Sequence, residues 1–367
     1  MIALYRSNNI FSSRVNKYVA FYKSHNLNYR VYGWDRLGEN LHKDNYSFFK
    51  YKCGYSVGGV KAIKNHCKWM RYVFSTLKGI DNVTTIHACD LNSAFPAALY
   101  KVLFNRHVVL IFDVCDWFSA NFAEKRLLKY SFNLLERFTC KVADEVIICE
   151  PERIAQIPFK LKKKELILPN IPKVDDPSVF ELKEKYQFSN EDITLAYFGG
   201  FAQSRFLLEL LDVIADIKVN LLIAGFGDEA IENKCKQISC SRDNVRYFGK
   251  LDTVTGLQMC YNADIIYAMY CTFNPNNVFA APNKYYEAMM LGKPIISTKG
   301  TILEKKIISQ NIGYIIGEST KELKNLLSNL EKEDMRDKGR NANVLWKNKY
   351  SNYVEGFFEN TYRLIIK

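Results

Sequence analysis

The sequence predicts two α/β domains, each built around a sheet of parallel strands. Short apolar runs alternate with longer stretches of helical periodicity, which is the pattern of repeated βαβ units. A length of 367 residues is typical of two domains, and 48% hydrophobic residues can fill a core in each. Residues 169–177 contain three prolines and interrupt the pattern, so we place the linker there. We therefore expect domains over residues 1–170 and 171–345.

The first domain is predicted from five apolar runs of strand length with helical stretches between them. Branched and aromatic side chains dominate these runs, as they do in buried strands. The predicted strands cover residues 2–6, 29–32, 84–88, 108–114 and 145–149. The predicted helices cover residues 15–24, 60–77, 94–103 and 122–138. Helical connections between strands indicate a parallel sheet.

The second domain repeats this alternation and adds glycines at the ends of successive strands. The predicted strands cover residues 195–198, 221–224, 245–248, 264–270 and 294–297, and helices follow over residues 203–217 and from about residue 228. Glycines stand after the first three strands, at Gly199, Gly200, Gly225, Gly227 and Gly249. Ligands of open parallel sheets bind at the carboxyl ends of strands, where glycine permits close approach to the backbone. We therefore predict a nucleotide crevice at this edge.

Residues 282–292 are predicted to form a helix at the same edge. Pro282 and Asn283 mark its start, Glu287 is expected in its first turn, and Gly292 ends it. The N-terminus of a helix offers free N–H groups and partial positive charge, which suit a diphosphate. A nearby carboxylate can accept hydrogen bonds from ribose hydroxyls. The segment could equally be an ordinary helix between two strands.

The end of the chain is also predicted to be helical, over residues 343–348 and 350–366. We treat residues 346–367 as a separate C-terminal helix. It either covers its own domain or crosses back to the first domain, and the sequence leaves both possibilities open.

The positive charge of the chain is confined to its first half. Residues 1–170 carry 26 Lys and Arg against 14 Asp and Glu, a net of +12, whereas the remaining residues are balanced. This asymmetry indicates an anionic partner, such as a phospholipid surface, a lipid pyrophosphate or nucleic acid, or else a solvated basic surface. Two basic segments contain the candidate docking residues for a membrane or acceptor, which are Lys125, Arg126, Lys129, Lys162, Lys163 and Lys164.

The remaining composition indicates a reduced compartment. The ten cysteines form no CxxC pairs, so we expect buried free thiols and no metal site. No run is long enough for a membrane span, and the first residues do not form a signal peptide. We expect a cytoplasmic protein that lies on the inner face of the cytoplasmic membrane.

The motifs of the second half, taken in order, resemble a known family. These motifs are Tyr197-Phe198-Gly199-Gly200 with Arg205, Gly225-Phe226-Gly227, Gly249-Lys250, Ala263-Asp264-Ile265, and Pro282-Asn283-Lys284 with Glu287 and Gly292. Together they resemble the donor-binding half of the retaining GT-B glycosyltransferases of the family-four type, also called glycosyl transferases group 1. The segments His87–Leu91 and Ile111–Phe118 resemble the first half of that family less specifically.

The resemblance implies two facing Rossmann-like domains, with a nucleotide-sugar donor held by the second and an acceptor held by the first. It implies no cofactor and no metal, because helix N-termini and basic side chains neutralise the leaving diphosphate. The implied donor-binding residues are Gly199, Gly200, Arg205, Gly225, Phe226, Lys250, Asn283, Lys284 and Glu287. The implied catalytic residues are Asp116, Asp90 and His87, although a lone buried histidine is often structural. The family has a further acid eight residues before Glu287, where this chain has Phe279.

The expected function is the transfer of one sugar to a glycan acceptor, and we expect this acceptor to be a lipid-linked intermediate of surface polysaccharide synthesis. Two alternatives stay open. One is a nucleotide-sugar epimerase of the same architecture, and the other is a basic protein that binds nucleic acid. The basic residues match no nucleic-acid-binding motif, and the predicted crevice lies in the neutral half, so we expect no nucleic-acid partner.

Overall fold

The chain folds into two α/β units, and its last residues return to the first unit. The computed structural model describes residues 1–54, 59–122, 125–174 and 176–366. The first unit comprises Met1–Asn170 together with the segment from Val354 onward, and the second comprises Ile171–Tyr353. The second unit thus extends past the predicted boundary at residue 345, and the returning segment begins at residue 354 rather than 346.

The first unit contains a seven-stranded sheet in the order β3-β2-β1-β4-β5-β6-β7, and all of its neighbouring strands are parallel. The strands are β1 (Ile2–Arg6), β2 (Tyr29–Asp35), β3 (Tyr46–Lys50), β4 (Thr85–Cys89), β5 (Val109–Val114), β6 (Glu145–Ile148) and β7 (Leu166–Ile167). The helices are α1 (Ser13–Ser24), α2 (Gly59–Lys78), α3 (Leu91–Leu103) and α4 (Arg126–Val142), with 3-10 turns at Phe118–Phe122 and Pro151–Gln156.

The sequence predicted the five central strands of this sheet but missed both edge strands, β3 and β7. The residues of β3 are only half-buried, so its apolar pattern is weak. The predicted helix over residues 122–138 begins later, at Arg126, because Phe118–Phe122 form a separate 3-10 turn. Part of that prediction, residues 123–124, lies outside the described residues.

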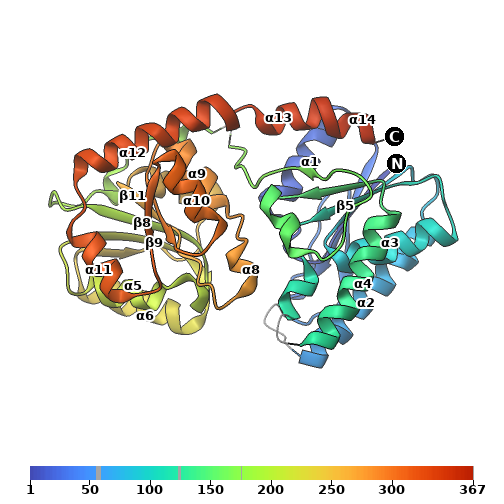
Figure 1. Ribbon diagram of the computed structural model, residues 1–367, viewed down its shortest axis with the longest axis horizontal. Helices are drawn as coiled ribbons and strands as arrows, with labels where there is room; N and C mark the ends of the chain where they lie inside the picture. Colours follow the sequence, from blue (N-terminus) through green and yellow to red (C-terminus); the bar gives the residue numbers. More distant parts are fainter. Residues whose placement is uncertain (55–58, 123–124, 175, 367) are drawn as a thin grey trace. The chain divides into compact units, whose positions relative to one another are not determined.

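The core of the first unit lies on both faces of its sheet. Helices α2, α3 and α4 cover one face, as Figure 1 shows, and enclose a cluster in which Trp34 and Trp69 stack at 5.8 Å. The opposite face is covered by α1 and by the returning segment, which consists of α13 (Tyr353–Phe357), a π-helical turn (Phe358–Tyr362) and α14 (Arg363–Ile365). Tyr362 is fully buried there, and its hydroxyl lies 2.5 Å from that of Tyr22 on α1. Of the two possibilities for the C-terminal helix, the contacts therefore show packing on the first unit.

The second unit contains a six-stranded parallel sheet in the order β10-β9-β8-β11-β12-β13. The strands are β8 (Thr194–Phe201), β9 (Asn220–Gly227), β10 (Val245–Tyr247), β11 (Ile265–Tyr267), β12 (Ile295–Thr298) and β13 (Gly313–Ile316). The helices are α5 (Leu207–Ile214), α6 (Glu229–Ser241), α7 (Thr253–Tyr261), α8 (Pro275–Val278), α9 (Asn283–Leu291), α10 (Ile302–Gln310), α11 (Thr320–Ser328) and α12 (Lys332–Leu345). A π-helical turn, Trp346–Tyr350, follows α12.

The second unit differs from the prediction in two ways. Strand β13 and the helices α7, α8, α10, α11 and most of α12 were not predicted. The predicted helix over residues 203–217 is instead a short 3-10 turn, Gln203–Arg205, followed by α5. Phe206 joins them in a left-handed conformation with φ of 54°, which interrupts the helix.

Both sheets reverse their strand order at one point, between β1 and β4 in the first unit and between β8 and β11 in the second. Ligands of open parallel sheets bind at the carboxyl ends of the strands beside such a reversal. The two edges that this rule selects carry most of the residues that the sequence singled out.

Candidate functional site

The glycine turn of the second unit lies where β8 and β9 end side by side. Gly199 pairs with Gly225 in the parallel register. A Cβ atom on Gly225 would lie 1.9 Å from the carbonyl oxygen of Gly199, and one on Gly199 would lie 2.5 Å from Nζ of Lys284. The Tyr197 hydroxyl donates a hydrogen bond of 2.6 Å to the carbonyl of Gly200 and so holds the turn. Only glycine fits at Gly199 and Gly225.

Lys284 and Glu287 form the centre of this edge. Helix α9 begins at Asn283, as predicted, and ends at Gly292 with φ of 66°. Glu287 lies in the second turn of α9 rather than the predicted first, but a spacing of three residues places it on the same face as Lys284. Nζ of Lys284 lies 4.7 Å from the centre of the Tyr197 ring. Among the described residues, neither side chain has a hydrogen-bond partner.

Burial shifts the pKa values of both groups toward neutrality. Burial lowers the pKa of Lys284 to about 8, although the Glu287 carboxylate acts in the opposite direction. Burial raises the pKa of Glu287 to about 7, and Lys284 offsets part of that shift. A half-buried ammonium and a half-buried carboxylate without hydrogen-bond partners are costly to keep, and perturbed pKa values of this kind mark functional sites.

Arg205 supplies a second cation near Lys284. Its guanidinium lies 4.4 Å from the centre of the Tyr270 ring, and Nη1 donates to Oδ1 of Asn277 over 3.4 Å. The positive charge of Arg205 contributes to the lowered pKa of Lys284. The prediction that a helix N-terminus at Gln203 adjoins Arg205 is wrong, because Gln203–Arg205 is a single turn. At this edge the helix N-terminus beside the glycine turn is that of α9.

The ends of β9 and β10 carry an exposed aromatic ring and an exposed lysine. Phe226 is 54% exposed, and Nζ of Lys250 lies 4.8 Å from the centre of its ring. The N–H of Gly225 donates to the carbonyl of Gly249 over 2.8 Å, which holds the two strand ends together. The predicted donor-binding residues Phe226 and Lys250 therefore form one surface.

The sequence missed a carboxylate that reaches the loop after β11. Phe279, which stands where the resembled family has an acid, directly follows α8 and is half-buried. Glu318, just after β13, accepts hydrogen bonds from the N–H and the hydroxyl of Thr272, at 2.5 and 2.7 Å. The apolar run of β13 is the sequence signal that could have identified Glu318, because β13 brings Glu318 to this edge of the sheet.

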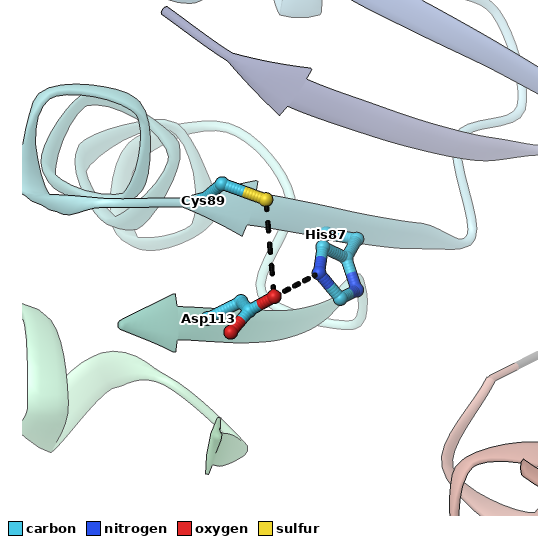
Figure 2. A group of neighbouring side chains, drawn as sticks. All are labelled: His87, Cys89 and Asp113. Atoms are coloured by element: carbon cyan, nitrogen blue, oxygen red, sulfur yellow. Dashed lines mark hydrogen bonds and ion pairs between the residues drawn. The ribbon is translucent and has the colours of Figure 1, made fainter. Parts of the chain in front are cut away.

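In the first unit, His87 lies inside the core and not at the edge of the sheet. Figure 2 shows it beside Asp113, and Nε2 lies 3.3 Å from Oδ2 of that carboxylate. Nδ1 lies 2.8 Å from the hydroxyl of Tyr362. His87 is fully buried, so these contacts favour the structural role over the predicted catalytic one.

The same group, His87, Cys89 and Asp113, is the one set of potential metal ligands among the described residues, with ligand atoms within 4.8 Å of one another. Arg14 donates to both carboxylate oxygens of Asp113, with its Nε at 3.0 and 2.8 Å. This guanidinium holds the pKa of Asp113 well below its usual range despite burial. Since the carboxylate already neutralises Arg14, the group does not fit a metal ion and forms a polar core.

The two predicted catalytic aspartates have different surroundings. Asp90 lies between β4 and α3 with φ of 62°, and its Oδ1 accepts a hydrogen bond of 3.1 Å from the N–H of Cys115. Burial raises the pKa of Asp90, while Arg6 lowers it and Asp116 raises it further. Asp116 is 62% exposed and pairs with Nη2 of Arg153 at 2.6 Å. Asp90 is therefore the better placed candidate, and Asp116 is committed to an ion pair.

The predicted docking residues lie on and around α4. Lys125 and Arg126 are exposed at its start, and Lys129 is half-buried. Lys162 and Lys164 are exposed, whereas Lys163 pairs with Glu145. The inner face of α4 packs on the core, but its outer face exposes an apolar stripe of Leu127, Tyr130 and Leu134. No helix of the described residues is both long enough and apolar enough to cross a membrane.

The comparison with protein families decides the class of the second unit. Residues 192–332 match the family of glycosyl transferases group 1. The second unit is a group 1 glycosyltransferase domain. All the predicted donor-binding residues of this glycosyltransferase lie within the matched segment, whereas Asp90, Asp116 and His87 lie outside it. The resemblance of the second half to glycosyl transferases group 1 is confirmed over these residues. No curated protein matches the chain in sequence.

Solved structures show that the whole glycosyltransferase has the GT-B type of fold. Sucrose-phosphate synthase from Thermosynechococcus elongatus is 15% identical with a TM-score of 0.73, over 99% of this chain and 98% of that one. WaaG, a glycosyltransferase involved in lipopolysaccharide biosynthesis, is 13% identical with a TM-score of 0.68, over 100% and 99%. Alr3699/HepE of Anabaena, in complex with UDP and glucose, is 13% identical with a TM-score of 0.66, over 99% of both chains. The predicted fold class of two parallel-sheet α/β domains is confirmed.

The cysteines of the glycosyltransferase agree only in part with the prediction of buried thiols. All ten are free, and six are buried, but Cys67 and Cys240 are exposed. Cys89 and Cys115 lie close to Arg6 and Asp90, where burial holds the pKa of both thiols well above the usual range. They are therefore neutral side chains at neutral pH and not nucleophiles.

Proposed function

We propose that this glycosyltransferase moves one sugar from a nucleotide-sugar donor to a glycan acceptor with retention of configuration at the anomeric carbon. The observation that carries the proposal is the Lys284–Glu287 pair, which is without hydrogen-bond partners among the described residues and lies beside Gly199. A similar structure, that of the Anabaena protein, holds UDP and glucose, and a donor of this chemistry suits the charges at this edge.

Each part of the donor has a matching group in the second unit. Glu287 accepts hydrogen bonds from the ribose hydroxyls, because its carboxylate has no other hydrogen-bond partner among the described residues. Arg205, Lys284 and the free N–H groups at the start of α9, including that of Asn283, bind the diphosphate. Gly199 and Gly225 leave room for the phosphates, with Gly200 completing the turn. Phe226 and Lys250 contact the base.

The proposed transfer exchanges one bond at the anomeric carbon for another. The bond from that carbon to the phosphate oxygen breaks, its electron pair leaves with the nucleoside diphosphate, and the acceptor oxygen bonds to the carbon as its proton is released. Two cations, Arg205 and Lys284, balance the charge that develops on the diphosphate, and we propose that no metal or cofactor is needed. In the first unit, Asp90 orients the acceptor hydroxyl.

We further propose that the acceptor is lipid-linked and that the first unit docks on the inner face of the cytoplasmic membrane. The support is the apolar stripe of α4 together with exposed Lys125, Arg126, Lys162 and Lys164. An amphipathic helix with basic flanks binds anionic lipid surfaces in this manner. The net charge of +12 in residues 1–170 is in agreement with such a partner.

The experiment that tests the function measures release of nucleoside diphosphate from a panel of nucleotide sugars, with and without a lipid-linked glycan acceptor. Acceptor-dependent release with a product of retained configuration is expected. Inverted configuration would reject retention alone. Interconversion of the nucleotide sugar without an acceptor would indicate an epimerase, and the absence of any turnover across the panel would contradict the proposal.

A further inference from the structure

Arg6, the last residue of β1, is a buried cation whose nitrogens are mostly without partners. Its side chain is only 9% exposed. Its Nε and Nη1 atoms are buried and have no hydrogen-bond partner among the described residues. Burial acts to lower the pKa of Arg6, but nearby groups that can carry negative charge, among them Asp90 and Asp113, raise it. The guanidinium is therefore kept charged, while two of its buried nitrogens have no hydrogen bond, which proteins rarely retain without a use.

The carboxylates around Arg6 are already in use. Both oxygens of Asp113 accept hydrogen bonds from Arg14, whose Nη1 also donates to the carbonyl of Leu168 over 2.8 Å. Oδ1 of Asp90 accepts from the N–H of Cys115. Arg6 therefore differs from Arg14: both arginines are buried in the same unit, but only Arg14 donates from its Nε to a carboxylate among the described residues.

Arg6 also stands at the place where a ligand of this sheet is expected. It ends β1 beside the reversal of strand order between β1 and β4, at the carboxyl edge. The next residue is rigidly held: the Ser7 carbonyl accepts from Nε of Arg36 over 3.0 Å, and the Ser7 hydroxyl accepts from Nδ2 of Asn92 over 2.6 Å. The surrounding loop is thus ordered by other contacts, which leave Arg6 free to bind a ligand.

A second buried polar atom at this edge is also without a partner. Oδ1 of Asn92 has no hydrogen-bond partner among the residues that the structure describes, while its Nδ2 contacts both Ser7 and Nδ1 of His66. Burial lowers the pKa of His66 to about 4, and Arg36 adds to this shift, so His66 is neutral. The edge therefore combines a free donor group on Arg6 with a free acceptor on Asn92.

We propose that Arg6 is an anion-binding residue of the first unit, which takes a phosphate or carboxylate group of a substrate whose hydroxyl groups are bound beside it. The chemistry alone allows two sources of this group, the diphosphate of the donor or an anionic group on the acceptor. The assignment of this anionic group to the acceptor rests on the proposed function. The proposal that Arg6 binds an anion does not rest on that function.

Stability distinguishes a ligand-binding Arg6 from a structural one. Arg6→Met keeps the length of the side chain and breaks no hydrogen bond of Nε or Nη1, but it removes a positive charge that acts on Asp90, so its melting temperature is expected to fall less than that of Arg14→Met. Arg14→Met is the matched control, because it leaves the buried Asp113 carboxylate unpaired and should lower the melting temperature. A loss of stability in Arg6→Met as large as that in Arg14→Met would overturn the proposal.

Binding of inorganic phosphate then tests the site directly. In an Arg205→Ala, Lys284→Met background, which removes the proposed anion site of the second unit, phosphate is expected to raise the melting temperature relative to chloride at equal ionic strength. Adding Arg6→Met should abolish this rise, and adding Arg6→Lys should keep part of it. No phosphate-specific rise in the background variant, or a rise that survives Arg6→Met, overturns the proposal.

The source of the anion follows from titrating UDP into the wild type and into Arg6→Met. A tenfold or greater loss of UDP affinity in Arg6→Met assigns Arg6 to the donor diphosphate. Unchanged UDP affinity, together with lost phosphate binding, assigns it to the acceptor. Because these measurements need no turnover, they stand apart from the test of sugar transfer: a failed transfer assay leaves the phosphate result intact, and the reverse also holds.

Discussion

The hydroxyl of Tyr362, near the carboxyl end of the chain, lies 2.8 Å from Nδ1 of His87 on the central strand β4. The same hydroxyl contacts Tyr22 on α1, and both partners are fully buried. The last helical segment therefore completes the polar core of the first unit and is more than a covering of its surface. Because His87 also contacts Asp113, one chain of polar contacts runs from the C-terminal segment to Arg14.

Replacing Tyr362 with Phe should destabilise the protein without changing donor binding. The substitution removes both hydrogen bonds and leaves Tyr22 and His87 with unsatisfied buried groups, at a cost of about 1–3 kcal/mol. Chemical denaturation measures the loss. Tyr130→Phe is the matched control, since Tyr130 is 64% exposed and should be neutral. Equal stability of the two variants would show that the Tyr362 contacts contribute nothing.

Glu287→Ala is expected to abolish most donor use. The ribose then lacks a charge-assisted hydrogen bond of about 1.5–3 kcal/mol, which corresponds to a loss of roughly 10- to 100-fold in affinity. Titration with nucleotide sugars and steady-state kinetics measure the change. Glu333→Ala, which alters an exposed acid on α12, serves as the control. A folded Glu287→Ala protein with wild-type kinetics would remove Glu287 from the site.

Arg205→Ala should weaken binding of the nucleoside diphosphate more than binding of the nucleoside. Arg205 has only a long hydrogen bond to Asn277 and a stacking contact with Tyr270, so the fold should survive its removal. We expect a loss of about tenfold or more for the diphosphate, measured by calorimetric titration of both ligands. Arg242→Ala, at an exposed arginine of the same unit, should have no effect. Parallel losses for both ligands would place Arg205 away from the phosphates.

Donor affinity should be highest between about pH 7 and pH 8. Glu287, with a pKa raised to about 7, must lose its proton to accept from the ribose, so affinity rises with pH through that value. Lys284, with a pKa lowered to about 8, must keep its proton to bind the diphosphate, so affinity falls above that value. Titrations across the range measure the profile. Glu287→Gln should flatten the acidic side and Lys284→Met the alkaline side; a profile that keeps both slopes in both variants contradicts the assignment.

Binding to acidic vesicles should depend on the outer face of α4. Leu127, the most exposed residue of its apolar stripe at 84%, is expected to insert, so Leu127→Asp should reduce sedimentation with acidic liposomes. Replacing Lys162, Lys163 and Lys164 with Ser should weaken binding by up to about 3 kcal/mol, at about 1 kcal/mol per residue. Lys163 should contribute least because it pairs with Glu145.

Two controls complete the vesicle experiment. Leu182→Asp changes another strongly exposed leucine, 71% exposed and in the second unit, and should leave binding unchanged. Raising the salt concentration should weaken binding of the wild type, because screening shortens the reach of the surface potential. If the wild type stays in the supernatant at low salt, the membrane proposal is wrong and the charge is merely solvated.

The edge of the second unit that carries the candidate donor-binding residues could largely be predicted from the sequence because its signals are local. Gly199 and Gly225 stand directly after apolar strands, and Pro282 and Gly292 bracket a helix in the printed order. Such signals need only neighbouring residues, since strand ends of a parallel sheet meet at one edge. The predicted helix over residues 203–217 is wrong at its start, because Phe206 adopts a left-handed conformation. No local preference of phenylalanine indicates that conformation.

The sequence by itself determined the class of fold, the charge asymmetry and which residues meet at the glycine-rich edge of the second unit, because periodicity, glycines and composition are properties of adjacent residues. Only the tertiary structure decided that His87 is a core residue bonded to Tyr362, that Arg14 neutralises Asp113, and that Glu318 reaches Thr272. It also decided that Nε and Nη1 of Arg6 have no hydrogen-bond partner among the described residues. Each of these facts concerns which polar groups, far apart in the sequence, form or fail to form an ion pair or hydrogen bond. Burial and pairing of polar groups depend on the whole fold, so they become visible only when distant strands and helices are brought into contact.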